Sequence, residues 1–140
     1  MASAYYDINA QQHSTFNFHV EYLDNSGNPV DLSGSIVRLQ VRPNYESTKL
    51  YLAATNSGVT TGGSTGEFDS TGGISGSGGV FVNSGETGGV FTGGIRFSVD
   101  ATSMGYVRAG SWKYSIDLIS GVTVEELMNG HFIVAPKTTR

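Results

Sequence analysis

Apolar and polar residues alternate with a period of two in several stretches, and this pattern constrains the fold more than any other feature. Between Thr15 and Leu23 every second residue is apolar, and the same alternation returns after Gly34 and after Gly110. The apolar sets are Phe16, Phe18, Val20, Tyr22; Val37, Leu39, Val41; and Trp112, Tyr114, Ile116, Leu118. Successive side chains of a strand point to opposite faces, so each stretch predicts a β-strand with one buried face.

Turn signals separate these stretches. Asp24 to Pro29, Ser120-Gly121 and Asn129-Gly130 predict turns, and Pro43 and Pro136 end strands. Shorter strands are expected over 49–54, 95–99, 122–128 and 131–135, with one helical turn after a candidate N-cap at Asp100. About seven short strands in 140 residues predict an all-β fold, an antiparallel immunoglobulin-like β-sandwich formed by one domain over 1–140.

Residues 58–94 differ from the rest, because 14 of the 20 glycines lie there and no Lys or Arg occurs between Lys49 and Arg96. One interpretation is a flexible linker. The other is an ordered Gly-rich arm inserted between strands, which we favour because the segment carries large apolar residues. We expect the arm to contact another protein, through the candidate residues Phe68, Val80, Phe81, Val90 and Phe91.

Charge and composition argue against several partners. The net charge is −4 and the basic residues are scattered singly, which disfavours binding to nucleic acid. No apolar run is long enough to span a bilayer and the first residues do not resemble a signal peptide, so we expect no membrane partner and synthesis in the cytoplasm. The chain has no Cys, which excludes disulfides and thiolate metal sites.

The sequence offers no convincing catalytic, cofactor or metal site. His13, His19 and His131 lack ligand spacing, and the segment from Asp24 lacks the Gly and the closing Glu of a calcium loop. Glu125-Glu126 is the one pair of adjacent carboxylates, and we interpret it as part of a solvated turn. The phosphate-binding motif GxxxxGK[ST] does not occur, and no Ser, His and Asp residues are grouped at a recognisable catalytic spacing. We therefore expect no enzyme, no cofactor and no metal.

Two regions outside the Gly-rich segment share a pattern with a known family. The first reads QQHSTFNFHVEYLDNSGNPVDLSGSIVRLQVR from Gln11 to Arg42, with Pro-Val-Asp-Leu-Ser-Gly before a strand that holds Arg-x-Gln-x-Arg. The second closes the chain with Gly-x-Phe-x-Val-x-Pro and a terminal Thr-Arg. These pieces resemble immunoglobulin-like virion structural proteins of tailed bacteriophages, including upper-baseplate and tail-fibre-attachment proteins, and similar chains of cyanobacterial myoviruses.

This resemblance implies a structural protein located in the virion, present in multiple copies, with other virion proteins such as baseplate, tail or fibre subunits as partners. We expect an adaptor at the baseplate or the tail fibre. A capsid decoration or cement protein is one alternative. A receptor- or glycan-binding module is another, with stacking surfaces from Tyr5, Tyr6, Tyr106 and Trp112, although the place of Trp112 in an apolar stripe favours a core role.

Overall fold

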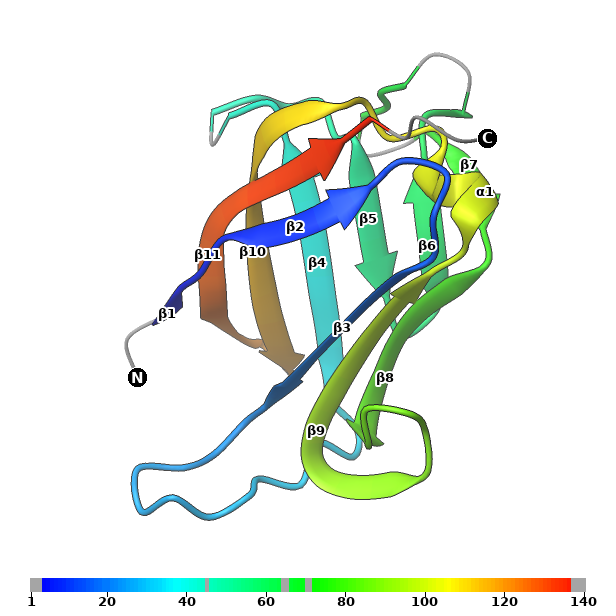
Figure 1. Ribbon diagram of the computed structural model, residues 1–140. Helices are drawn as coiled ribbons and strands as arrows, with labels where there is room; N and C mark the ends of the chain where they lie inside the picture. The colour runs from blue at the N-terminus through cyan, green and yellow to red at the C-terminus, as the bar shows by residue number, and fades with distance from the viewer. Residues whose placement is uncertain (1–3, 45, 64–65, 70–71, 137–140) are drawn as a thin grey trace.

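A computed structural model describes residues 4–44, 46–63, 66–69 and 72–136 and shows two β-sheets that pack face to face (Figure 1). The larger sheet has eight strands. Their order is β1 (Ala4–Tyr5), β11 (Thr123–Ala135), β10 (Gly110–Ser120), β4 (Ile36–Arg42), β5 (Leu52–Thr55), β6 (Gly58–Thr61) and β7 (Ile74–Gly76), and β2 (Ile8–Gln11) also pairs with β11. The smaller sheet has the order β3 (Phe16–Glu21), β9 (Val90–Val99) and β8 (Gly78–Ser84).

Most neighbouring strands are antiparallel, as expected. β1 and β2 are the exceptions, because both run parallel to β11 at the edge of the larger sheet. The short helix α1 (Ala101–Met104) follows β9, and the Asp100 carboxylate accepts a hydrogen bond from the Ser103 N–H at 3.1 Å. The predicted N-cap and helical turn are therefore confirmed.

The core lies between the two sheets, and the alternating apolar residues that the sequence analysis identified are part of it or pack against it. Phe16 of β3, Phe97 of β9 and Phe132 of β11 are all buried, and the Phe16 and Phe132 rings meet edge to face at 5.4 Å between centroids. β4 contributes Val37, Leu39 and Val41, and β10 contributes Tyr114, Ile116 and Leu118. The predicted strands around 15–23, 37–41 and 112–118 are thus confirmed.

The Gly-rich segment 58–94 is not an arm outside the sandwich, which corrects the prediction. It forms β6 and β7 of the larger sheet, β8 of the smaller sheet and the start of β9. Glycine is needed where backbones pack closely: a Cβ at Gly94 would lie 2.2 Å from the Ser84 carbonyl oxygen, and one at Gly78 would lie 2.0 Å from that of Ser98. The glycines here therefore permit close packing of strands.

The predicted turn at Asn129-Gly130 is also wrong, because β11 continues through both residues. Gly130 has a φ of 153°, and a Cβ there would lie 2.3 Å from the Tyr6 carbonyl oxygen. The Tyr6 N–H donates to the Asn129 carbonyl at 2.9 Å. The glycine thus allows the segment between β1 and β2 to cross close to β11.

Candidate protein-contact surface

Three of the five predicted contact residues lie at the surface, on the hairpin formed by β8 and β9. Phe81 is 41% exposed, Phe91 43% and Val90 92%. Phe81 projects outward because its neighbours Val80 and Val82 face the other sheet, as the alternation of a strand requires. Large apolar side chains exposed together are typical of surfaces that bind other proteins.

Phe68 and Val80 are buried, so the structure corrects their assignment as contact residues. Val80 is 3% exposed and pairs with Phe97 inside the sandwich. Phe68 is 8% exposed, and its backbone exchanges hydrogen bonds with Leu50 at 2.9 and 2.7 Å. Val80 belongs to β8 of the smaller sheet, and Phe68 forms an isolated β-bridge with Leu50, so both side chains pack within their own chain.

Arg96 and His19 complete this surface, and we call the set Phe81, Val90, Phe91, Arg96 and His19 the hairpin face. The Arg96 guanidinium carbon lies 4.2 Å from the centre of the Phe81 ring, and the His19 ring meets the Phe91 ring edge to face at 6.3 Å. The His19 Nε2 lies 2.9 Å from the Ser84 carbonyl oxygen, which can only accept, so Nε2 carries the hydrogen. Aromatic rings with Arg are enriched at protein interfaces.

Asn83 fixes the hairpin and was missed by the sequence analysis. It adopts a left-handed φ of 51°, and its side-chain oxygen accepts from the N–H groups of Leu32 and Gly93, each at 3.1 Å. Its amide group donates to Asp31 Oδ1 at 2.9 Å. Asn often adopts left-handed backbone, but no local signal indicates which distant groups its side chain will bind.

The Asp31 side chain accepts hydrogen bonds in the same region, next to the hairpin. It accepts from the backbone N–H of Ser33 at 2.9 Å and from the Ser33 hydroxyl at 2.8 Å. These bonds, the backbone one first, and the bond from Asn83 hold the pKa of the Asp31 carboxyl below its usual value. The carboxylate therefore links the loop before β4 to the hairpin in its charged form.

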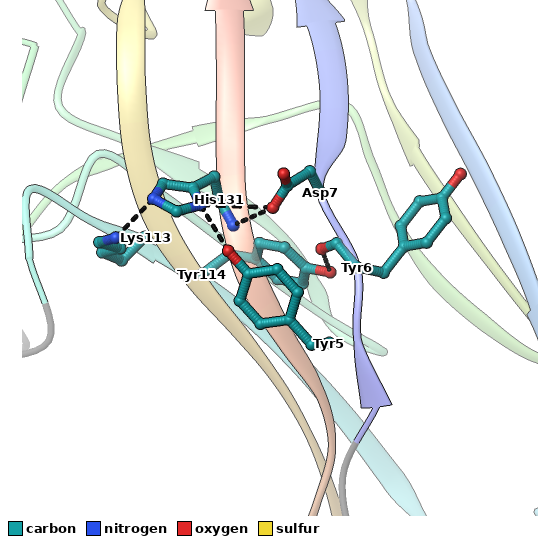
Figure 2. Close-up of polar contacts among 6 residues, drawn as sticks. All are labelled: Tyr5, Tyr6, Asp7, Lys113, Tyr114 and His131. Carbon is teal, nitrogen blue, oxygen red and sulfur yellow. Dashed lines mark hydrogen bonds and ion pairs between the residues drawn. The ribbon is translucent and has the colours of Figure 1, made fainter.

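A second polar cluster surrounds His131 on the outer surface of β11 (Figure 2). The Tyr5 hydroxyl lies 2.8 Å from His131 Nδ1, and Asp7 Oδ1 lies 3.3 Å from the same nitrogen. Lys113 Nζ lies 2.6 Å from Nε2 on the other side of the ring. The Tyr114 hydroxyl donates to the Tyr6 carbonyl close by.

The chemistry of these contacts indicates a structural role for the cluster. A Lys113 ammonium can only donate, so Nε2 accepts and the ring hydrogen is on Nδ1, which faces the Asp7 carboxylate. The hydrogen bond from the His131 backbone N–H is the main cause that lowers the pKa of Asp7. The contacts fasten the segment before β2 to β10 and β11.

The adjacent carboxylates Glu125 and Glu126 lie within β11, so the predicted solvated turn at these residues is wrong. Their side chains have separate partners. Glu125 accepts from the Tyr22 hydroxyl at 2.8 Å, and Glu126 accepts from the Asn129 amide at 2.6 Å. Burial, followed by the bond to Glu125, raises the pKa of Tyr22. Within the described ranges, no group of three or more His, Asp or Glu residues could hold a metal ion.

Trp112 is half-buried at the margin of the core. Its ring meets Tyr51 edge to face at 4.7 Å, and its Nε1 donates to the Arg108 carbonyl at 2.8 Å. Both contacts of the indole are therefore made with residues of its own chain. Tyr5, Tyr6 and Tyr106 are exposed, but the Tyr6 ring packs against Phe18 at 5.8 Å.

Comparison with protein-family models and with curated proteins finds no match for this chain. Across the described residues, no helix has the length and apolar character needed to cross a membrane.

Proposed function

We propose that this chain is a structural protein of a tailed-phage virion, an adaptor at the baseplate or tail fibre that binds other virion proteins through the hairpin face. The observation that carries the proposal is the exposure of Phe81, Val90 and Phe91 on one hairpin, beside Arg96. The sequence resemblance at both ends of the chain supplies the virion context.

The strand order supports an immunoglobulin-like assignment of the variable type. That type places strands B, E and D in one sheet, and adds C′ and C″ to the sheet of G, F and C. β3, β9 and β8 take the places of B, E and D; β11, β10 and β4 take those of G, F and C; and β5 and β6 take those of C′ and C″. In this assignment the Gly-rich segment supplies strands of the fold itself.

The hairpin face suits contact with a protein partner. Burial of each large apolar side chain contributes roughly 1.5–3 kcal/mol if it was fully exposed before, and the partly exposed rings contribute less. Aromatic and Arg side chains are also the residues that most often dominate the binding energy of interfaces. Symmetric copies in a particle would repeat this contact.

The proposal is tested by replacing the three exposed side chains together, as Phe81→Ser, Val90→Ser and Phe91→Ser, and measuring copies of the chain per purified phage particle. We expect the variant to remain folded and its copy number to fall at least tenfold. The matched control is Ile36→Ser with Val122→Ser, which changes exposed apolar residues in β4 and in the turn between β10 and β11 and should leave the copy number unchanged.

Normal incorporation of the triple variant would contradict the proposal, as would absence of the unmodified chain from particles. Immunogold labelling then locates the chain. Label at the tail tip agrees with an adaptor, whereas label over the head would indicate the decoration or cement alternative.

A further inference from the structure

β3 is an open edge of the smaller sheet, with unpaired backbone groups along its length. The Tyr22 N–H donates to the Gly93 carbonyl at 2.7 Å, which sets the ladder so that even-numbered residues bond to β9. The N–H and C=O groups of Asn17, His19 and Glu21 therefore point away from β9. In the described part of the chain, no hydrogen bond satisfies these outward backbone groups.

An apolar groove of about 280 Å³ lies beside this edge, between β3 and the strands of the larger sheet. Its apolar lining comes from both sheets and includes Ala4, Val20, Ile95, Ile116, Leu127 and Met128. Val20, Leu127 and Met128 are only partly buried, so side chains of another molecule can reach them. The free backbone groups and the groove thus lie side by side.

Two other edges, at β8 and at β7, are less suited to pairing. β8, at the far edge of the smaller sheet, packs against the larger sheet: a Cβ at Gly79 would lie 3.0 Å from the Thr55 carbonyl oxygen and 3.2 Å from Gly58 Cα. β7 has only three residues. β3 has six residues and an apolar groove at its side.

The arrangement favours a single strand over a second copy of the sandwich. β1 and β2 flank the open edge, because Tyr6, between them, packs against Phe18 in the middle of β3. Two-fold pairing of β3 with β3 would place the larger sheets of both copies on one side of the joined sheet. Their β1 and β2 strands would then compete for the same space.

The negative charge at the groove indicates which kind of extended segment would fit it. Glu21 lines the groove and is exposed. Tyr22 also lines the groove, and its hydrogen bond to Glu125 places that second carboxylate next to the groove. None of the nine lining residues is Lys or Arg. A segment with a basic side chain at this end would complement the two carboxylates.

We propose that the open edge of β3 binds an extended segment of another protein chain as an added strand. Alternate apolar side chains of the segment enter the groove, and a Lys or Arg side chain lies against Glu21 and Glu125. Backbone hydrogen bonds to residues 17, 19 and 21 provide the pairing, as in other cases of strand addition to a sheet edge. This site shares only His19 with the hairpin face, through its backbone groups and not its side chain.

The test uses a synthetic six-residue peptide, a lysine followed by alternating valine and threonine, with NMR of the isotope-labelled chain as the readout. We expect saturable shifts and slower exchange of the His19 and Glu21 amides. Two N-methylated peptides provide the control, because a strand bonds to one neighbour through every second residue. Methylation of one alternate set of amides should weaken binding at least tenfold, and methylation of the other set should not.

Leu127→Lys introduces a positive charge into the groove and should weaken peptide binding at least tenfold. The triple substitution in the hairpin face should leave it unchanged, which separates this proposal from the proposed function. Absence of shifts at β3, or equal binding of both methylated peptides, would overturn the proposal. Slower exchange of the His19 amide with rising concentration of the chain alone would identify a second copy as the occupant and would also overturn it.

Discussion

Asn83 is the residue on which the geometry of the hairpin face depends most. Its side chain joins β8 to the loop before β4 and to Gly93 in β9, and its own backbone is left-handed. Two costs therefore accompany its replacement. One is the loss of hydrogen-bond partners for two backbone N–H groups. The other is the strain of a left-handed conformation in a residue that has a Cβ but lacks the polar side chain with which Asn tolerates it.

The two costs are separated by a pair of substitutions. We predict that Asn83→Ala destabilises the chain by about 2–3 kcal/mol, through unpaired N–H groups and backbone strain together. Asn83→Gly loses the same hydrogen bonds but tolerates the positive φ, so its cost should be smaller by about 1 kcal/mol. Denaturant unfolding measures both, and equal costs would show that the conformation of residue 83 carries no strain.

At the scale of elements, the strands with a clear two-residue period were predictable because each has one face in the core and one in solvent. β7, β8 and the start of β9 were not, because Gly and Ser usually indicate loops and carry little periodicity. Their pairing depends on close approach to distant backbones, such as Ser84 to Gly94. Local sequence contains no information about such a contact.

This interpretation of the glycines predicts a difference between two positions. Gly94 has an ordinary φ, yet a Cβ there would meet the Ser84 carbonyl at 2.2 Å, so Gly94→Ala should destabilise the chain by about 1–3 kcal/mol. Gly72 also has an ordinary φ, and the nearest atom to a Cβ there is 3.6 Å away. Gly72→Ala should change stability by less than about 0.5 kcal/mol. If both variants unfold at similar temperatures, the backbones of Gly94 and Ser84 are not closely packed, which would contradict this interpretation of the glycines.

For the molecule as a whole, the sequence predicted an all-β fold but not which segments belong to each of the two sheets. The error about residues 58–94 had a consequence for the contact surface. Phe68 and Val80 were assigned to an interface although they are buried, whereas Phe81, Val90 and Phe91 are exposed as expected. Arg96 and His19 lie beside these residues because β3 and β8 both pair with β9, a pairing that the sequence did not predict.

The hairpin face requires that the Gly-rich segment forms part of the smaller sheet, through the pairing of β8 with β9. In the observed register, Phe81 pairs with Arg96 and Gly79 with Ser98, and the parity of the ladder directs the amides of Phe81 and Gly79 at β9. Amide hydrogen exchange followed by NMR tests this most directly. We predict that these two amides are protected within about tenfold of those in the β4–β10 ladder, as members of one cooperative unit. Exchange at the rate of an unfolded chain would contradict the account.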